Sequence, residues 1–202
     1  MKIRITLIEE MLGTKAANKE VFASFIASKC PDDDLRRQEI ETAEHREEAG
    51  TTVYHRDENG NLMLWDYQIK GFLKEAANIM RQCAEKPTDE DGKKGRNPWS
   101  AAKSKFDNFV FVSPRKISLG KKEPDGVCER PLRAETMQGP RVSLARSEVV
   151  DAGVSFECEI QLLPGCPITE KMITQCLDYG KFKGIGQWRN SGKGRFTWEV
   201  VE

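Results

Sequence analysis

The stretch that decides the fold is KFKGIGQWRNSGKGRF (181–196), in which four glycines fall within eleven residues. Closely spaced glycines leave backbone N–H groups unshielded, so a chain of phosphates can approach them. A helix is expected before the loop, over 168–180, and a strand after it, over 195–201. Thr169 is the expected N-cap of this helix and Gly180 its C-cap, and Ile173, Cys176 and Leu177 are expected to face inward. The loop is therefore not a P-loop, which needs GxxxxGK[ST] after a strand, nor a dinucleotide fingerprint. Its composition alone fits a phosphate-binding loop and a flexible glycine turn equally well.

The side chains of the loop suit a nucleic acid. Trp188 can stack on a base, and Gln187 and Asn190 can hydrogen-bond to a base edge. Positive charge runs along the same path, with no acid to interrupt it, from Lys181, Lys183, Arg189, Lys193 and Arg195.

The rest of the chain predicts an α+β protein. Apolar and polar residues alternate over 1–9, which is typical of a half-buried strand, and Asn59-Gly60 predicts a hairpin over 51–66. The other predicted elements are helices over 18–29, 33–48 and 67–83, strands over 106–113 and 115–119, a long, partly extended connection over 120–140, and a hairpin formed by strands 141–150 and 154–163. This order fits a ferredoxin-like (RRM-like) antiparallel sheet with helices on one face and insertions.

Composition limits the classes of function. Thirty-two basic and thirty-two acidic residues cancel, so any nucleic-acid site must be local. The N-terminus lacks the features of a signal peptide, and no window of eighteen apolar residues exists, so we expect a cytoplasmic protein without a membrane partner. The six cysteines form no CxxC pair and lie far in sequence from both histidines. No metal site or cofactor is therefore expected.

A second informative stretch is YQIKGFLKEA (67–76). A polar, glycine-containing helix start offers free N–H groups to an anion. Lys70 and Lys74 lie one helical turn apart and share a face. An ordinary amphipathic helix with a tolerated glycine explains the same residues.

Together the two stretches resemble the RAMP superfamily, whose members form the backbone of CRISPR effector complexes or process their guide RNA. Members show a "pGsslKGalR" helix start and, near the end, a "GxGxxrxxGxG" loop. The helix start is matched by Lys70, Gly71, Leu73 and Lys74, and the loop by Gly184, Gly186, Arg189, Gly192, Gly194 and Phe196. The resemblance implies a single RAMP-like domain over 1–202, with insertions at 31–50 and 85–100.

The sequence also departs from the family. The helix start has Tyr67-Gln68-Ile69 where members usually have a proline and small residues. Backbone subunits that cut target RNA use an aspartate before the hairpin, and here no acid lies between Gly50 and Arg56. A non-catalytic member is the favoured interpretation.

The resemblance implies binding of RNA or a short oligonucleotide without cleavage. Expected partners besides RNA are CRISPR or other RAMP subunits, or further copies of this chain. The expected contact residues are Lys70, Gly71, Lys74, Lys183, Gly184, Gly186, Gln187, Trp188, Arg189, Asn190, Gly192, Lys193, Gly194 and Arg195. Residues 128–148 are a third candidate contact region, where Arg130, Arg133, Arg141 and Arg146 add charge and, by the resemblance, Met137 can act as a wedge between bases. An ordinary connection with paired charges explains the same residues and is slightly favoured.

Two alternatives remain open. A stand-alone protein of phage or prophage type could sequester a nucleotide signal or mimic a CRISPR subunit. A metal-independent endoribonuclease could instead use His55, with Tyr54, Lys70 and Arg189 as partners, provided that these residues converge. His45 is the other histidine, and it falls in a charged run typical of helix surface.

Overall fold

The computed structural model describes residues 1–17, 51–84, 97–136 and 139–201. The helices predicted over 18–29 and 33–48, the 31–50 insertion, His45, Met137 and most of the 85–100 insertion lie outside these ranges. The side chains of residues 132–143, which include Arg133 and Arg141, also lie outside the description.

A four-stranded antiparallel sheet forms the centre of the molecule, in the order β12-β1-β11-β7. Its strands are β1 (Lys2–Leu7), β7 (Val110–Ser113), β11 (Ser155–Leu162) and β12 (Phe196–Val200). Helix α4 (Asp66–Cys83) lies between β1 and β7 in the chain, and α6 (Glu170–Asp178) lies between β11 and β12. These six elements have the strand order and connections of a ferredoxin-like fold, so the predicted fold class is confirmed.

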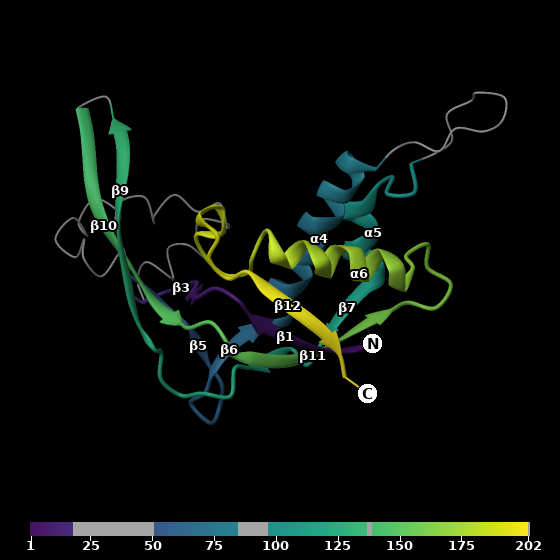
Figure 1. Cartoon of the computed structure of the whole chain (residues 1–202), viewed down its shortest axis with the longest axis horizontal. Coiled ribbons are helices and arrows are strands. Elements are labelled where there is room, and N and C mark those ends of the chain that lie inside the picture. The colour runs from purple at the N-terminus through teal and green to yellow at the C-terminus, as the bar shows by residue number, and fades with distance from the viewer. Residues whose placement is uncertain (18–50, 85–96, 137–138, 202) are drawn as a thin grey trace, which may run out of the picture.

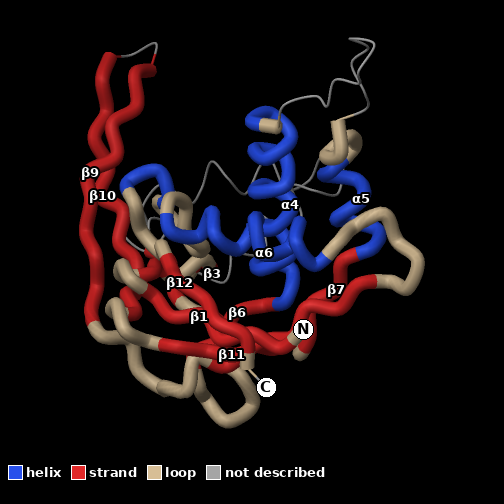
Figure 2. Tube along the Cα trace, turned by 45° about the vertical axis from the view of Figure 1, so that its right-hand side comes forward, coloured by secondary structure: helices blue, strands red, loops and turns tan. Residues whose placement is uncertain are grey.

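Helices α4 and α6 cover one face of this sheet (Figures 1 and 2). The alternation in β1 places Ile3, Ile5 and Leu7 on the covered face, where they are fully buried. The inward faces of the helices agree with the predicted ones, and their buried residues are Ile69, Phe72, Leu73, Ala76, Ala77, Met172, Ile173, Cys176 and Leu177. Thr169 caps α6 as predicted, because its hydroxyl accepts a hydrogen bond from the Met172 N–H at 3.3 Å.

The opposite face of the sheet is polar along its two central strands. Arg4 of β1 pairs with Glu157 of β11 at 2.7 Å and with Glu199 of β12 at 3.1 Å. Lys2 pairs with Glu157 at 2.7 Å. Charged side chains on this face form ion pairs across neighbouring strands. The two central strands therefore present no apolar surface here that a further layer would have to cover.

Two smaller sheets flank the central one. The first has the order β2-β10-β4-β3, with β9 paired to β10, and its strands are β2 (Met11–Leu12), β3 (Lys15–Ala16), β4 (Thr51–Val53), β9 (Gly126–Thr136) and β10 (Gly139–Val150). The second contains β5 (His55–Arg56), β6 (Leu62–Trp65) and β8 (Lys116–Ser118). The predicted Asn59-Gly60 turn joins β5 to β6, which confirms that hairpin.

The connection predicted over 120–140 is extended over its larger part, as expected, but it is a paired strand, which the prediction missed. Residues 126–136 form β9, which pairs antiparallel with β10 over eleven residue pairs. The two strands make a hairpin arm that projects away from the helices (Figure 1). Among the described strands, β9 pairs with β10 alone, so no apolar period-2 pattern marks it, and Pro131 is tolerated because no described strand pairs with the other edge of β9.

Two further expectations are corrected. Residues 102–109, partly assigned to a strand over 106–113, form α5 (Ala102–Phe109), because Phe106 stacks on the buried Trp99 with ring centroids 6.2 Å apart. Strand β7 begins only at Val110. The strands over 141–150 and 154–163 exist but do not pair as a hairpin, because β10 belongs to the flanking sheet and β11 to the central one.

Gly180 does not cap α6 in the left-handed conformation. The chain continues into a 3-10 turn, η2 (Tyr179–Lys181), and Gly180 instead makes room for the ring of Phe196. A Cβ at Gly180 would lie 2.4 Å from Cζ of that ring. The side chain of Phe196 is fully buried and packs edge-on against Phe72 at 5.1 Å.

Alanine substitutions at Gly180 and Gly71 should change the free energy of unfolding in opposite directions. Gly180→Ala overpacks the ring of Phe196 and should lower the free energy of unfolding by about 1–3 kcal/mol. Gly71→Ala, inside α4 with no atom near its Cβ position, should raise it by about 0.4–1 kcal/mol. Urea denaturation measures both. Equal effects would contradict the packing described for Phe196.

Candidate nucleic-acid interface

The glycine-rich loop is folded onto the N-terminal segment of the chain. The N–H of Gly194 donates to the carbonyl of Glu10 at 2.7 Å, and the N–H of Ile8 donates to the carbonyl of Arg195 at 2.9 Å. Within the loop, the N–H of Ile185 donates to the carbonyl of Gly194 at 3.0 Å. A second 3-10 turn, η3 (Arg189–Ser191), forms the exposed tip. These bonds define the loop as an ordered element.

Three glycines are required by close backbone contacts. A Cβ on Gly184 would lie 2.1 Å from the carbonyl carbon of Gly194, and a Cβ on Gly194 would lie 1.9 Å from the oxygen of Ile185. A Cβ on Gly186 would meet the oxygen of Leu12 at 2.8 Å. Gly192 differs, because its Cβ position meets nothing closer than 3.6 Å. Most of the glycine pattern is therefore accounted for by how the loop folds.

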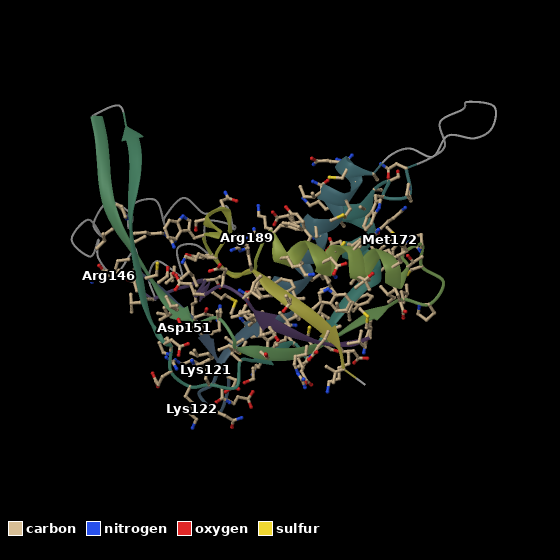
Figure 3. All side chains as sticks on the ribbon, viewed as in Figure 1. Lys121, Lys122, Arg146, Asp151, Met172 and Arg189 are labelled. Carbon is tan, nitrogen blue, oxygen red and sulfur yellow. The ribbon has the colours of Figure 1, made fainter. Side chains whose placement is uncertain are left out.

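A cavity of about 250 Å³ lies between this loop and α4. It brings Gly71 of α4 together with Gly186 and Arg189 of the loop, three residues that the two sequence stretches single out. Thr14 and Gln68 add polar groups to its wall. Figure 3 labels Arg189 in the loop and Arg146 near the base of the hairpin arm.

Glu75 neutralises the basic groups beside this cavity. Its carboxylate pairs with Lys183 at 3.0 Å and with Arg189 at 2.5 Å. Burial would raise the pKa of Glu75, but hydrogen bonds and charge from Lys183 and Arg189 outweigh it and hold that pKa below its usual value. The carboxylate of Glu75 therefore occupies the position in which an anionic ligand would contact Lys183 and Arg189.

The other predicted cations also have partners. Arg195 pairs with Glu9 at 2.7 Å, and Lys193 pairs with Glu10. Lys74 pairs with Asp107 of α5 at 2.8 Å, and Lys70 lies over the ring of Phe111, 5.1 Å from its centroid. Instead of a continuous basic patch, the described residues form a set of ion pairs around the loop.

Spacing in α4 explains which residues reach the cavity. Gln68, Gly71 and Glu75 follow one another at three and four residues and therefore share a face. Lys70 and Lys74 share a different face, directed toward β7 and α5. Gly71 also lies in the second turn of the helix, which begins at Asp66, so its N–H belongs to the helix interior. Gln68 and Glu75 line the cavity but are not among the contact residues predicted from the sequence. Their spacing of three and four residues from Gly71 is the signal that marks them.

The loop contacts the hairpin arm through Gln187 and Trp188. The Gln187 side-chain oxygen accepts from Arg130 Nη2 at 3.2 Å and from the Thr52 hydroxyl at 3.4 Å. Arg130 lies over the Trp188 ring, 4.7 Å from its centroid, and the opposite side of Trp188 is partly exposed. Asn190 is exposed at the tip and accepts a hydrogen bond from Lys183 at 3.3 Å.

His55 and its proposed partners do not converge. His55 packs edge-on against Trp65 at 5.7 Å, and burial, followed by the charge of Lys15, lowers its pKa. The Tyr54 hydroxyl donates to the buried carbonyl of Met11 at 2.6 Å, and burial raises the pKa of Tyr54 far above its usual value. Arg189 is paired with Glu75, on the far side of α4 from Lys70. These four residues therefore do not form the acid–base arrangement expected for an endoribonuclease that uses His55.

Metal-binding side chains do not cluster in the described ranges. Over the same residues, every helix is too short or too polar to cross a bilayer.

Comparisons with known proteins identify no family, because no protein-family model and no curated protein matches the chain. Two solved structures are similar in shape, each at 11% sequence identity. One is a chain of the Type III-B Cmr-beta complex bound to cognate target RNA, with a TM-score of 0.47, covering 100% of this chain and 58% of that one. The other belongs to a Type IV-B CRISPR complex, with a TM-score of 0.48, covering 99% and 89%. This chain thus spans little more than half of the first.

Alanine at Gly194 should unfold the loop, whereas alanine at Gly192 should be tolerated. Both residues have positive φ angles, +72° and +88°, so backbone strain of about 1–2 kcal/mol is common to both substitutions. Gly194→Ala adds the clash with Ile185, for a total loss of more than ~4 kcal/mol. Chemical denaturation of the two variants measures the difference. A similar loss of unfolding free energy in the two variants would mean that the close contact between Gly194 and Ile185 does not require glycine.

The ion pairs of Glu75 predict a pH dependence of stability. Because its folded pKa is lowered, its contribution is present above the usual value of 4.5 and is lost as the pH falls through the folded value. Glu75→Gln should therefore differ from the parent chain most at neutral pH, and the difference should vanish in acid. Urea denaturation between neutral and acidic pH tests this, and a pH-independent difference would refute it.

Proposed function

We propose that this chain binds single-stranded RNA, or another short oligonucleotide, without cutting it, at the cavity between α4 and the glycine-rich loop. The observation that carries the proposal is the cavity itself. Gly71, Gly186 and Arg189 line it together, although they come from two stretches more than one hundred residues apart. The Cβ position of Gly71 is open, so the lack of a side chain there leaves room for a sugar-phosphate backbone to approach the protein main chain.

The groups around the cavity suit a phosphate. Within the described ranges, the N–H of Gly186 donates to no acceptor. Lys183 and Arg189 can exchange the carboxylate of Glu75 for a phosphate, because partly exposed ion pairs contribute only about 0–1 kcal/mol. The exposed side of Trp188 offers a surface on which a base can stack.

The uncovered face of the central sheet is a poorer site. RRM domains stack bases on aromatic side chains of their two central strands. Here the corresponding strands, β1 and β11, present Lys2, Arg4 and Glu157, which are joined in ion pairs. A strand of RNA is therefore expected at the loop.

The shape of the cavity favours a strand over an enclosed nucleotide. Pockets that hold small molecules are usually about 300–1,000 Å³, and this cavity is smaller. A phosphodiester that crosses the site needs less enclosed volume, since only its phosphate enters. Association with RAMP or CRISPR subunits stays a prediction of the sequence resemblance.

Fluorescence polarisation with labelled oligouridine tests the proposal. The parent chain should bind at low salt, and binding should weaken as salt rises, because phosphate contacts release counterions. Glu75→Gln should tighten binding about 5-fold, which corresponds to the ~1 kcal/mol between unit charges about 4 Å apart in water.

Asp107→Asn is the matched control, because it frees Lys74 on the other face of α4 and should leave affinity nearly unchanged. Absence of oligouridine binding would overturn the proposal. If only a cyclic oligonucleotide raised the melting temperature, the site would belong to a nucleotide-sequestering protein.

A further inference from the structure

Arg130 is the one charged residue that is buried in the described part of the chain. It lies on β9, where the hairpin arm meets the glycine-rich loop, and only 9% of its surface is exposed. Its Nη2 donates to Gln187, while Nε and Nη1 have no acceptor among the described residues. A guanidinium without a counter-ion is costly in a buried position, so a protein that keeps one there has a use for its charge.

Nearby acids and hydroxyls do not satisfy this charge. Glu129, the neighbour in sequence, pairs with Arg146 of β10 at 2.8 Å. The buried hydroxyl of Ser147 hydrogen-bonds to Thr52 at 2.7 Å, and Thr52 in turn contacts Gln187. Across the described residues, no carboxylate comes within ion-pair distance of Arg130.

Trp188 covers the guanidinium. Its ring stacks on Arg130 while 42% of the residue stays exposed to solvent. Its backbone is left-handed, with φ of +53°, a conformation that is strained for a bulky side chain. The residue that shields the unpaired charge is therefore itself open to solvent, where a ligand can reach it.

We propose that Arg130 is a receptor for one phosphate, covered by Trp188 until a ligand binds. The phosphate pairs with the unused N–H groups of Arg130, and Trp188 leaves the guanidinium to stack on an adjacent base. This inference rests on the proposed function and extends it. Gly186 and Arg189 face the α4 cavity, whereas Gln187 and Trp188 between them face Arg130, so one bound strand can contact both sides of the loop.

Stability of the free protein tests the receptor without any RNA. Arg130→Met keeps the length of the side chain and removes the unpaired charge, and should raise the melting temperature by about 2–4 °C. Arg146→Met is the matched control on the neighbouring strand and should not raise it. A fall in melting temperature for Arg130→Met would mean that Arg130 is a structural residue and would overturn the proposal.

Ligand binding supplies the second test. Inorganic pyrophosphate, at matched ionic strength, should stabilise the parent chain and not Arg130→Met. For oligouridine, Arg130→Met should bind more weakly, with a salt slope less steep by about 0.7, the effect of one lost phosphate contact. Arg130→Lys should restore part of the affinity. An unchanged affinity and slope would overturn the proposal.

The cover is tested by Trp188→Ala. Removing the ring uncovers Arg130, so pyrophosphate should bind more tightly, while oligouridine should bind about 10-fold more weakly because a stacking surface is lost. A parallel loss of both affinities would refute a movable cover. Stronger binding of UMP than of oligouridine would assign the site to a free nucleotide. Failure of the parent chain to bind oligouridine would remove the proposed function, and the stability and pyrophosphate results would still decide the role of Arg130.

Discussion

The backbone contact between Gly184 and Gly194 is the constraint on which the candidate site depends. A Cβ on Gly184 would overlap the backbone of Gly194, and a Cβ on Gly194 would overlap the backbone of Ile185. The two ends of the loop can therefore pack this closely only if both residues are glycine. That contact fixes Gly186 and Arg189 beside α4, and Gln187 and Trp188 beside the hairpin arm. The hydrogen bond from Gly194 to Glu10 then ties the loop to the start of the chain. The ferredoxin-like core supplies the rigid base for all of these contacts.

Electrostatics around the loop differ from those of a simple basic groove. Glu75, Glu9 and Glu10 hold most of the loop cations in ion pairs, in agreement with a chain whose formal charge is zero. Such a surface attracts nucleic acid weakly from a distance and depends on local exchange of carboxylate for phosphate. Arg130 is the exception, since its charge is buried without an acid. In the proposed binding mode, a response to a ligand is therefore expected where the loop meets the hairpin arm, next to the cavity at α4.

The sequence was sufficient for the fold class, because it follows from local periodicity, and the resemblance to the RAMP superfamily grouped the 67–76 stretch with the loop. The sequence was insufficient for β9, which pairs with β10 alone among the described strands and so shows no apolar pattern, and for the role of Gly180, which depends on a ring sixteen residues later. The partners of Lys74, Lys193 and Arg195 depend on tertiary contacts with distant acids. In the sequence, Arg130 is one of several arginines in the 128–148 region, and nothing distinguishes it, because burial without a counter-ion has no sequence pattern.

The location of bound RNA tests the central claim most directly. Hydrogen exchange with and without oligouridine should show protection of amides at 185–190, around Gly71 in α4, and near Arg130 in β9. The open face of the central sheet, over 2–6 and 155–159, should exchange at the same rate in both states. Protection confined to that sheet face, with an unchanged loop, would contradict the assignment of the glycine-rich loop as the binding site.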